Sequence, residues 1–340
     1  AHRFFGYSVS IDGDAILVGS NGNDEIIPTP PSKAYVFRRS VAGIWEEEGI
    51  LTASDGLLGD DFGSSVAING HTALIGALGH NNGGAGSPSS RPNSGAAYVF
   101  IHNPVTNLWS QQAKLVASDT AADEFFGNAV SLYEGVAVVG AVGNDEVTLR
   151  GLPGVPGSAY VFASDMAGVW TQQAKLIPPS GMPLDFFGGS VAIHGNTILV
   201  GAFGNDSMGG NAGAAYMFGY DPVTTIWSHQ VMLTASDPVA GGFFGISVGV
   251  GDRDAVIGAM GDDLLLVPAP SAAYLYRYDL TTARWAEQEK LTASDTMDFD
   301  LFGISVALEN NITIVGASQG PIAGVGAAYA YEHALHPEPE

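Results

Sequence analysis

Two glycine-containing motifs recur six times along this chain of 340 residues, always at the same separation. At six places a Phe-Gly dipeptide is followed thirteen residues later by the glycine of a (Val/Ile)-Gly-(Ala/Ser) triplet. Successive copies lie 57 to 64 residues apart, so the motif pair is constant while the connections vary in length. This pattern predicts one supersecondary unit that is repeated six times. The Phe-Gly glycines are Gly6, Gly63, Gly127, Gly188, Gly245 and Gly303, and the triplet glycines are Gly19, Gly76, Gly140, Gly201, Gly258 and Gly316.

Each repeat reads as four strands, and the second copy illustrates the pattern. Asn69-Gly70 is typical of the two-residue turn of a tight hairpin. The strand after it is apolar on both faces, as expected for a strand enclosed between neighbouring sheets. A long connection rich in Gly, Ser, Pro and Asn separates the second strand from the third. The four strands are expected over residues 64–68, 72–77, 96–100 and 109–117.

All five tryptophans occupy one position of the repeat. Each follows the tyrosine of the third strand by ten or eleven residues. Because these positions obey the repeat, they indicate a packing role, a large ring covering the outer part of each sheet, rather than stacking against sugars or bases. The residues are Trp45, Trp109, Trp170, Trp227 and Trp285.

Four antiparallel strands per unit, stacked radially, predict an all-β fold, a six-bladed β-propeller that forms a single domain over residues 1–340. Seven blades would need about one more repeat than the chain holds. The last blade is expected to be incomplete, since no Trp and no Lys-Leu-Thr-Ala segment follow Tyr329. Its missing strand would come from another segment or from a partner. The repeats are expected at about 1–55, 56–119, 120–180, 181–237, 238–295 and 296–340.

These motifs match a known family. Phe-Gly-x-Ser-Val, Val-Gly-Ala, Gly-Ala-Ala-Tyr-Val-Phe, Trp and Lys-Leu-Thr-Ala-Ser-Asp together resemble the FG-GAP repeat. That repeat builds the propeller of integrin α-subunits and occurs in many bacterial secreted proteins. The resemblance implies a propeller and an extracellular setting, secreted or at the cell surface, and it implies no single activity. Integrin-type calcium sites need an inserted Asp-x-Asp-x-Asp-Gly loop, but here that stretch is a short turn, so those sites are expected to be absent.

The net charge of −23, from 35 acidic and 12 basic residues, limits the kinds of partner that the chain can bind. A strongly acidic chain lacks the basic face that neutralises nucleic-acid phosphates, and attraction to anionic membrane surfaces is disfavoured for the same reason. No apolar run approaches the ~18–20 residues of a membrane span, so direct insertion is not expected. The partners expected are therefore a protein or a glycan ligand.

The connections between strands 2 and 3 differ most in length, and variable loops on a constant scaffold usually carry binding specificity. Asn and Asp gather there and just before the Phe-Gly motifs. Such oxygens suit Ca²⁺, although the same residues also hydrogen-bond their own turns. The expected ligand-binding residues are Asn23, Asp24, His80, Asn81, Asn144, Asp145, Asn205, Asp206, Asp262 and Asp263; the candidate Ca²⁺ ligands are Asp61, Asp145, Asp185 and Asp206.

Catalytic motifs are weak, and no enzymatic activity is expected. The eight histidines are scattered among different repeat positions, and no His-Glu-x-x-His pair occurs. The sequence thus predicts an extracellular, non-enzymatic binding or adhesion module, with a possible role for bound cations. One alternative is a structural subunit that docks a neighbour through the open sixth blade. Another is a carboxylate-based hydrolase that uses Asp61, Asp145 or Asp185.

Overall fold

The fold is all-β, and its regular elements are strands throughout the described part of the chain. In these ranges no helix is long and apolar enough to cross a membrane. Two compact units, Ala1–Ile177 and Pro178–Glu340, divide the chain. The computed structural model describes residues 4–21, 32–82, 92–143, 156–261, 270–295, 300–318 and 326–334.

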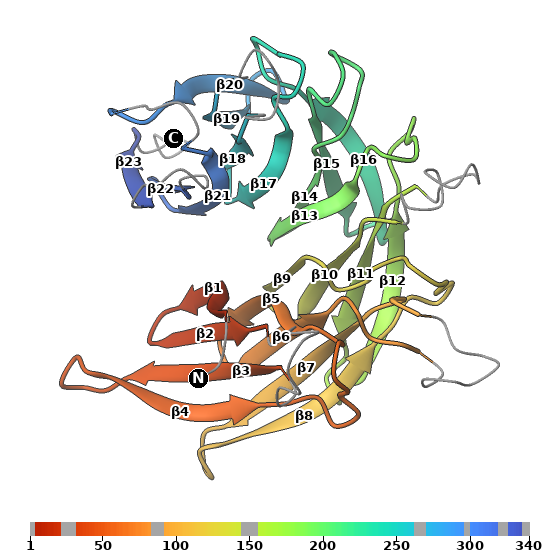
Figure 1. The fold of residues 1–340 in the computed structure, drawn as a ribbon, viewed down its shortest axis with the longest axis vertical. Coiled ribbons are helices and arrows are strands. Elements are labelled where there is room, and N and C mark those ends of the chain that lie inside the picture. Colours follow the sequence, from red (N-terminus) through yellow and green to blue (C-terminus); the bar gives the residue numbers. More distant parts are fainter. Residues whose placement is uncertain are drawn as a thin grey trace. The chain divides into compact units, whose positions relative to one another are not determined.

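The first unit contains three antiparallel sheets of four strands, here called blades 1, 2 and 3 (Figure 1). Blade 1 consists of β1 (Phe5–Asp12), β2 (Ala15–Ser20), β3 (Lys33–Arg39) and β4 (Trp45–Leu51). Blade 2 consists of β5 (Phe62–Asn69), β6 (Thr72–Ala77), β7 (Ala96–Asn103) and β8 (Leu108–Leu115). Blade 3 consists of β9 (Val130–Tyr133), β10 (Val136–Ala141), β11 (Ser158–Ser164) and β12 (Trp170–Leu176).

The second unit contains blades 4, 5 and 6. Blade 4 consists of β13 (Phe187–His194), β14 (Thr197–Ala202), β15 (Ala214–Asp221) and β16 (Ile226–Leu233). Blade 5 consists of β17 (Phe244–Val250), β18 (Asp254–Ala259), β19 (Ala272–Asp279) and β20 (Arg284–Leu291). Blade 6 has three strands, β21 (Phe302–Glu309), β22 (Ile312–Ala317) and β23 (Ala327–Glu332).

This architecture confirms the predicted six-bladed β-propeller with an incomplete last blade. Strands follow one another in order within every sheet, as in a meander. One detail of the prediction was wrong. Asn69 pairs with Thr72, so the hairpin turn of blade 2 is Gly70-His71 and not Asn69-Gly70. The turn starts at Gly70 because this residue adopts a positive φ of 58°, which glycine tolerates without strain.

The fixed separation of the two glycine motifs has a packing cause, and blade 2 illustrates it. Ser65 pairs with Gly76 across the β5–β6 hairpin, after a register shift at Phe62. A Cβ on Gly76 would lie 2.0 Å from the carbonyl oxygen of Gly127, the Phe-Gly glycine of blade 3. The Ser65 hydroxyl donates a hydrogen bond of 2.7 Å to the same oxygen. Any change in hairpin length would separate the glycine from the serine, so the spacing cannot vary.

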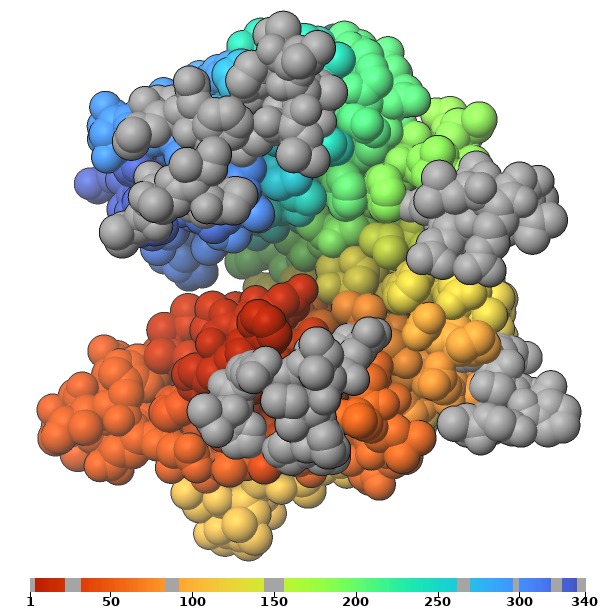
Figure 2. All heavy atoms as spheres, viewed as in Figure 1, coloured from red at the N-terminus to blue at the C-terminus, as the bar shows by residue number. Residues whose placement is uncertain are grey.

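The hydrophobic core lies between neighbouring blades of a unit. Val36 of blade 1 and Ile75 of blade 2 belong to one buried cluster, and Leu74 and Val139 belong to the cluster between blades 2 and 3. The phenylalanine of each Phe-Gly motif packs edge-on against the third strand; for Phe62 the ring centroids of Tyr98 and Phe100 lie 5.6 and 6.1 Å away. The space-filling view shows successive blades of each unit in continuous contact (Figure 2).

The tryptophans pack on the outer strands, as predicted. The rings of Trp109 and Trp170 lie against the buried clusters between blades 1 and 2 and between blades 2 and 3. Each indole N–H donates to the fourth strand of the preceding blade, Trp109 to Glu48 at 3.0 Å and Trp170 to Gln112 at 2.9 Å. These bonds tie the outer strands of adjacent blades together.

Candidate functional site

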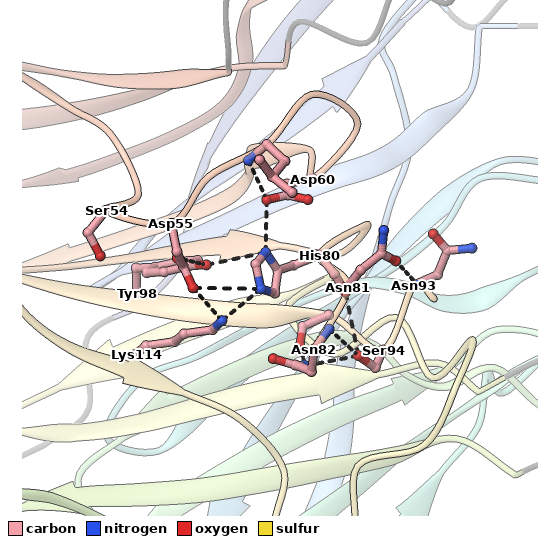
Figure 3. A network of polar contacts seen from close by, with 12 residues as sticks. Ser54, Asp55, Asp60, His80, Asn81, Asn82, Asn93, Ser94, Tyr98 and Lys114 are labelled. Carbon is pink, nitrogen blue, oxygen red and sulfur yellow. Dashed lines mark hydrogen bonds and ion pairs between the residues drawn. The ribbon is translucent and has the colours of Figure 1, made fainter. Parts of the chain in front are cut away.

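The connection into blade 2 and the connection between β6 and β7 meet at one end of the blade. A polar cluster forms there, here called the His80 network, from Asp55, Asp60, His80, Tyr98 and Lys114 (Figure 3). His80 lies at its centre and is 5% exposed, although it is a polar residue. A polar side chain is buried at such a place only if its hydrogen bonds are made.

The hydrogen bonds fix the tautomer of His80. Lys114 Nζ lies 2.7 Å from His80 Nε2, and an ammonium group can only donate, so Nε2 must be the acceptor. The proton therefore resides on Nδ1, which donates to Asp60 Oδ2 at 2.8 Å. Asp60 Oδ2 also accepts the backbone N–H of Leu57 at 2.8 Å. The neutral imidazole thus joins a buried carboxylate to an ammonium group.

Asp55 receives two donors from the next strands. The Tyr98 hydroxyl donates to Oδ1 at 2.8 Å, and Lys114 Nζ donates to Oδ2 at 2.7 Å. Partial burial alone would raise the pKa of the Asp55 carboxyl, but the hydrogen bonds from Lys114 and Tyr98 outweigh it, so the pKa is lowered. Burial and the Asp55 carboxylate raise the pKa of Tyr98, which keeps the phenol protonated.

The same three residue types recur in other blades. Tyr160 and Lys175 donate to Asp119 at 3.0 and 2.6 Å, and Tyr274 and Lys290 donate to Asp237 at 2.7 and 2.6 Å. We call this arrangement the Asp-Tyr-Lys clasp. In each case the aspartate follows the fourth strand of one blade, while the tyrosine and lysine belong to the next blade. The clasp is therefore a repeated structural connection, and His80 with Asp60 is an addition particular to blade 2.

Asn205 and Asp185 are brought together in blade 4, at the positions that correspond to His80 and Asp60. Asn205 Nδ2 donates to Asp185 Oδ2 at 3.1 Å and lies 3.4 Å from the Tyr216 hydroxyl. Both residues are buried. Asp185 Oδ2 also accepts the backbone N–H of Met182 at 3.0 Å. The neighbouring Asp206 is exposed and accepts the backbone N–H of Asn211 at 2.8 Å, within its own loop.

Asn81 and Asp61 have different surroundings. Asn81 Oδ1 accepts the backbone N–H of Asn93 at 2.8 Å, and Asn93 Nδ2 donates to Asp123 at 3.0 Å, which links the loop of blade 2 to the entry of blade 3. Asp61 adopts a φ of 55°, and its buried Oδ1 has no hydrogen-bond partner in the described structure. Burial, together with the charge of Asp60, raises the pKa of the Asp61 carboxyl.

The remaining predicted site residues, Asn23, Asp24, Asn144, Asp145, Asp262 and Asp263, lie outside the described residues. In the ranges that are described, no group of three or more His, Asp or Glu side chains is arranged to hold a metal ion. Asp61 and Asp185 belong to different units. Of the candidate Ca²⁺ ligands that can be located, Asp61 lies in the first unit, and Asp185 and Asp206 lie in the second.

The sequence prediction did not identify the clasp, although the signal was present. Lys-Leu-Thr-Ala-Ser-Asp and the third-strand tyrosine were both recognised as repeat motifs. Asp55 and Lys114 belong to different repeats and are 59 residues apart, so their pairing depends on how one blade packs on the next. Chemically, the polar groups of the His80 network already bond one another. Ser94, which lies beside the network, is fully buried, and its hydroxyl accepts a hydrogen bond from the side chain of Asn82.

Comparison with known proteins agrees with the fold. The sequence model of the FG-GAP repeat family matches residues 1–37, 45–100, 109–162, 170–218, 227–276 and 285–331. The first segment covers the first three strands of blade 1, and each later segment covers the fourth strand of one blade and the first three strands of the next. Together the six segments cover most of the chain. No curated protein matches the sequence. On the strength of the six matched segments and the propeller architecture, the chain belongs to the FG-GAP repeat family.

Proposed function

We propose that this chain is a non-enzymatic binding module of a secreted or cell-surface protein. It uses the connections between strands 2 and 3, together with those that join successive blades, to bind a protein or a glycan. One observation carries the proposal. The spacing of the two glycine motifs is constant and the spacing of the tyrosine and tryptophan differs by at most one residue, whereas the distance from the triplet glycine to the third-strand tyrosine varies from 13 to 22 residues. Length variation confined to one end of a rigid scaffold is typical of a recognition surface.

The chemistry of this end favours binding over catalysis. The titratable groups of the His80 network are held by one another, and Ser94, whose hydroxyl lies 3.5 Å from the backbone oxygen of His80, is buried. A nucleophile or general base has to reach a substrate atom, which a fully bonded and buried group does not do. The network instead holds His80, at the start of the strand 2–3 connection of blade 2, in a fixed position.

The test is a loop exchange. In the loop variant, residues 83–91 are replaced by a short Gly-Ser linker. In the control variant, Val105 and Thr106 of the β7–β8 hairpin, at the other end of the same blade, are replaced by Gly and Ser. Both proteins are probed with an array of defined glycans and with purified cell-surface glycoproteins. We expect the loop variant alone to lose binding. Binding that survives the loop exchange but is lost in the hairpin variant would place recognition at the wrong end.

Calcium belongs to the proposal as an aid to this surface, with Asp61, Asp145, Asp185 and Asp206 as candidate ligands. A cation at Asp185 would have to share the oxygen that now accepts Met182 and Asn205. Calorimetry on chelator-stripped protein, with a thermal melt in parallel, tests this. Binding with a raised melting temperature supports the site, because a ligand that binds only the folded state stabilises it. An unchanged melt with no heat of binding removes calcium from the proposal.

A second function has support in blade 6. Within the described residues β23 pairs only with β22, which leaves its other edge open. Tyr329 already donates to Asp295 at 2.6 Å, so two of the three clasp positions are filled and the lysine is missing. A strand from a neighbouring domain or subunit would complete the blade.

Strand docking can be tested with a peptide that corresponds to residues 108–119, which carries the fourth strand and the following aspartate of blade 2. We expect the peptide to protect the amides of β23 from hydrogen exchange and to raise the melting temperature with its concentration. A peptide with Lys114→Ala should bind more weakly, and a scrambled peptide should not bind. Equal effects of all three peptides would contradict specific strand addition.

A further inference from the structure

A cleft of about 810 Å³ lies between blades 4 and 5. Its walls are β15 and β16 on one side and β19, β20 and the β17–β18 turn on the other. It opens at the end of the blades where the hairpin turns lie, opposite to the strand 2–3 connections. The residues used below are Gly219, Tyr220, Arg253, Tyr278, Arg284 and Trp285, all of which line this blade 4–5 cleft.

The cleft exists where the repeated contact between outer strands is broken. Gln230 occupies the position of Gln112, which accepts the indole N–H of Trp170. Gln230 instead donates to the backbone oxygen and the hydroxyl of Ser228, at 3.2 and 2.9 Å. The indole N–H of Trp285 has no hydrogen-bond partner among the described residues, so it remains available to a ligand at the wall of the cleft.

A single glycine opens the space. Gly219 corresponds to Arg38 in blade 1 and to Ile101 in blade 2. Arg38 forms an ion pair with Glu48, and Ile101 packs against the core between blades 2 and 3. At Gly219 no side chain fills the gap, and Gln230 lies across it, 3.3 Å from the position that a Cβ would take. These three junctions thus differ at this position, and the cleft lies at the junction that carries the glycine.

The lining combines aromatic rings with cationic groups. Tyr278 and Trp285 have ring centroids 5.5 Å apart at one wall, whereas the ring of Tyr220 lies against Trp227, with ring centroids 5.1 Å apart. The guanidinium groups of Arg253 and Arg284 have no ion pair with any described residue, in a chain that carries only 12 basic residues. The carboxylates of Asp221 and Asp252 also border the cleft. They would repel a small inorganic anion but can accept hydrogen bonds from hydroxyl groups.

We propose that the blade 4–5 cleft binds a carboxylated pyranose, such as a uronic acid unit of an acidic glycan. A pyranose presents an apolar C–H face to the aromatic rings, hydroxyl groups to the Trp285 N–H and the two carboxylates, and one carboxylate to a guanidinium. A pocket of this volume suits a ligand of one or two sugar units. The site lies at the opposite end of the blades from the loop surface proposed above and does not depend on it.

The test follows the indole N–H signals of the ¹⁵N-labelled chain by NMR during titration with trigalacturonic acid, the Trp285 signal being assigned with Trp285→Phe. Cellotriose and sodium sulfate serve as neutral-sugar and plain-anion comparators. We expect the Trp285 signal to shift with trigalacturonic acid at concentrations below about 10 mM, and at least about tenfold less affinity for cellotriose. No shift of Trp285, equal binding of cellotriose, or a shift produced as well by sulfate would overturn the proposal.

Two variants test the geometry. Gly219→Ile introduces the residue that blade 2 carries at this position and fills the cleft, and Arg284→Gln removes an exposed charge without touching the core. Each variant should weaken trigalacturonic acid binding by at least about tenfold. Arg284→Gln does so because a charged hydrogen bond is lost, and Gly219→Ile because access to the cleft is blocked. Arg39→Gln, an exposed arginine 5.6 Å from the ring of Trp45 in blade 1, is the control and should bind normally. If Gly219→Ile does not fold, the affinity of Arg284→Gln for trigalacturonic acid is the deciding measurement. An unchanged affinity of that variant contradicts the proposal.

Discussion

In four places the carbonyl oxygen of a Phe-Gly glycine occupies the space that a side chain on the second strand of the preceding blade would need, at Gly63, Gly127, Gly245 and Gly303. At Gly76 a Cβ would meet Gly127 O at 2.0 Å and Ser65 Oγ at 2.2 Å. The carbonyl belongs to the backbone of another blade, so it cannot move aside as the end of a flexible side chain can. The glycines therefore set how closely two blades approach, and the serine hydroxyl satisfies the carbonyl at that distance.

Gly76→Ala should consequently destabilise the protein by about 2–4 kcal/mol, the range for severe overpacking in a close-packed interior. Urea denaturation followed by circular dichroism measures the change. Gly210→Ala is the matched control, because a Cβ there meets nothing within 4 Å and its φ is not positive. Equal stability of the two variants would show that the blades can separate at little cost.

The aspartate of the clasp gives the protein a pH dependence. Burial raises the pKa of Asp119, but hydrogen bonds from Lys175 and Tyr160 outweigh it, so the folded pKa lies below the ordinary value. A group whose folded pKa is depressed stabilises the fold above its unfolded pKa of ~3.9, and this contribution disappears as the pH falls through the folded pKa.

Asp119→Asn should therefore reduce the free energy of unfolding at pH 7 by no more than about 1 kcal/mol, since the pair is half exposed and screened by solvent. The difference from the original protein should vanish near pH 2, where the carboxylate is protonated in both states. Denaturation series at the two pH values measure it, with the exposed Glu46→Gln as a control. A difference that persists unchanged in acid would mean that the clasp does not act through its charge.

Among the elements, blade 4 differs from its neighbours because it lacks the clasp. Ser180 stands where blades 2, 3 and 5 have the aspartate, and Met232 stands where they have the lysine. The tyrosine is present as Tyr216; burial and the nearby Asp185 raise its pKa. Ser180, Tyr216 and Met232 all belong to the second unit, so the missing contacts can be restored without altering the remainder of the chain.

The double variant Ser180→Asp with Met232→Lys should stabilise the protein by about 0.5–1 kcal/mol, the usual value of a partly exposed ion pair with a shared hydrogen bond. Each single substitution should have little effect or a small unfavourable one. A double-mutant cycle from denaturation curves isolates the pair, because it subtracts the separate effects. A coupling energy of zero would show that the loop containing Pro178 and Pro179 holds residue 180 away from the strand.

For the whole molecule, the net charge of −23 is the property most open to test. Repulsion among like charges favours expanded states, and added salt screens it over a Debye length of ~10 Å at 0.1 M. The melting temperature should rise by several degrees between about 20 and 500 mM NaCl, since screening acts on the net repulsion more than on the few short ion pairs. Comparison with CaCl₂ at equal ionic strength separates screening from site binding. A falling melting temperature would mean that the ion pairs dominate.

Several parts of this description were predictable from local sequence. The Asn69-Gly70 dipeptide predicted the hairpin, and the apolar run of 72–77 predicted a strand buried on both faces, because both depend on residues close together in the chain. The missing Trp and Lys-Leu-Thr-Ala segment after Tyr329 predicted the three-stranded last blade. The turn was misplaced by one residue, since both Asn69-Gly70 and Gly70-His71 satisfy the preference for glycine at positive φ.

The sequence by itself determined the number of blades, the strands within each blade and the family, because the same local motifs occur in six copies along the chain. Only the tertiary structure decided which polar residues meet. Asp55 reaches Lys114 because adjacent blades bring different repeats together, and His80 reaches Asp60 because two connections of one blade meet at the same end of it. The blade 4–5 cleft likewise follows from one glycine, Gly219, whose effect depends on the side chain of Gln230 and on the facing blade. Packing between repeats is a long-range property, and no local pattern encodes it.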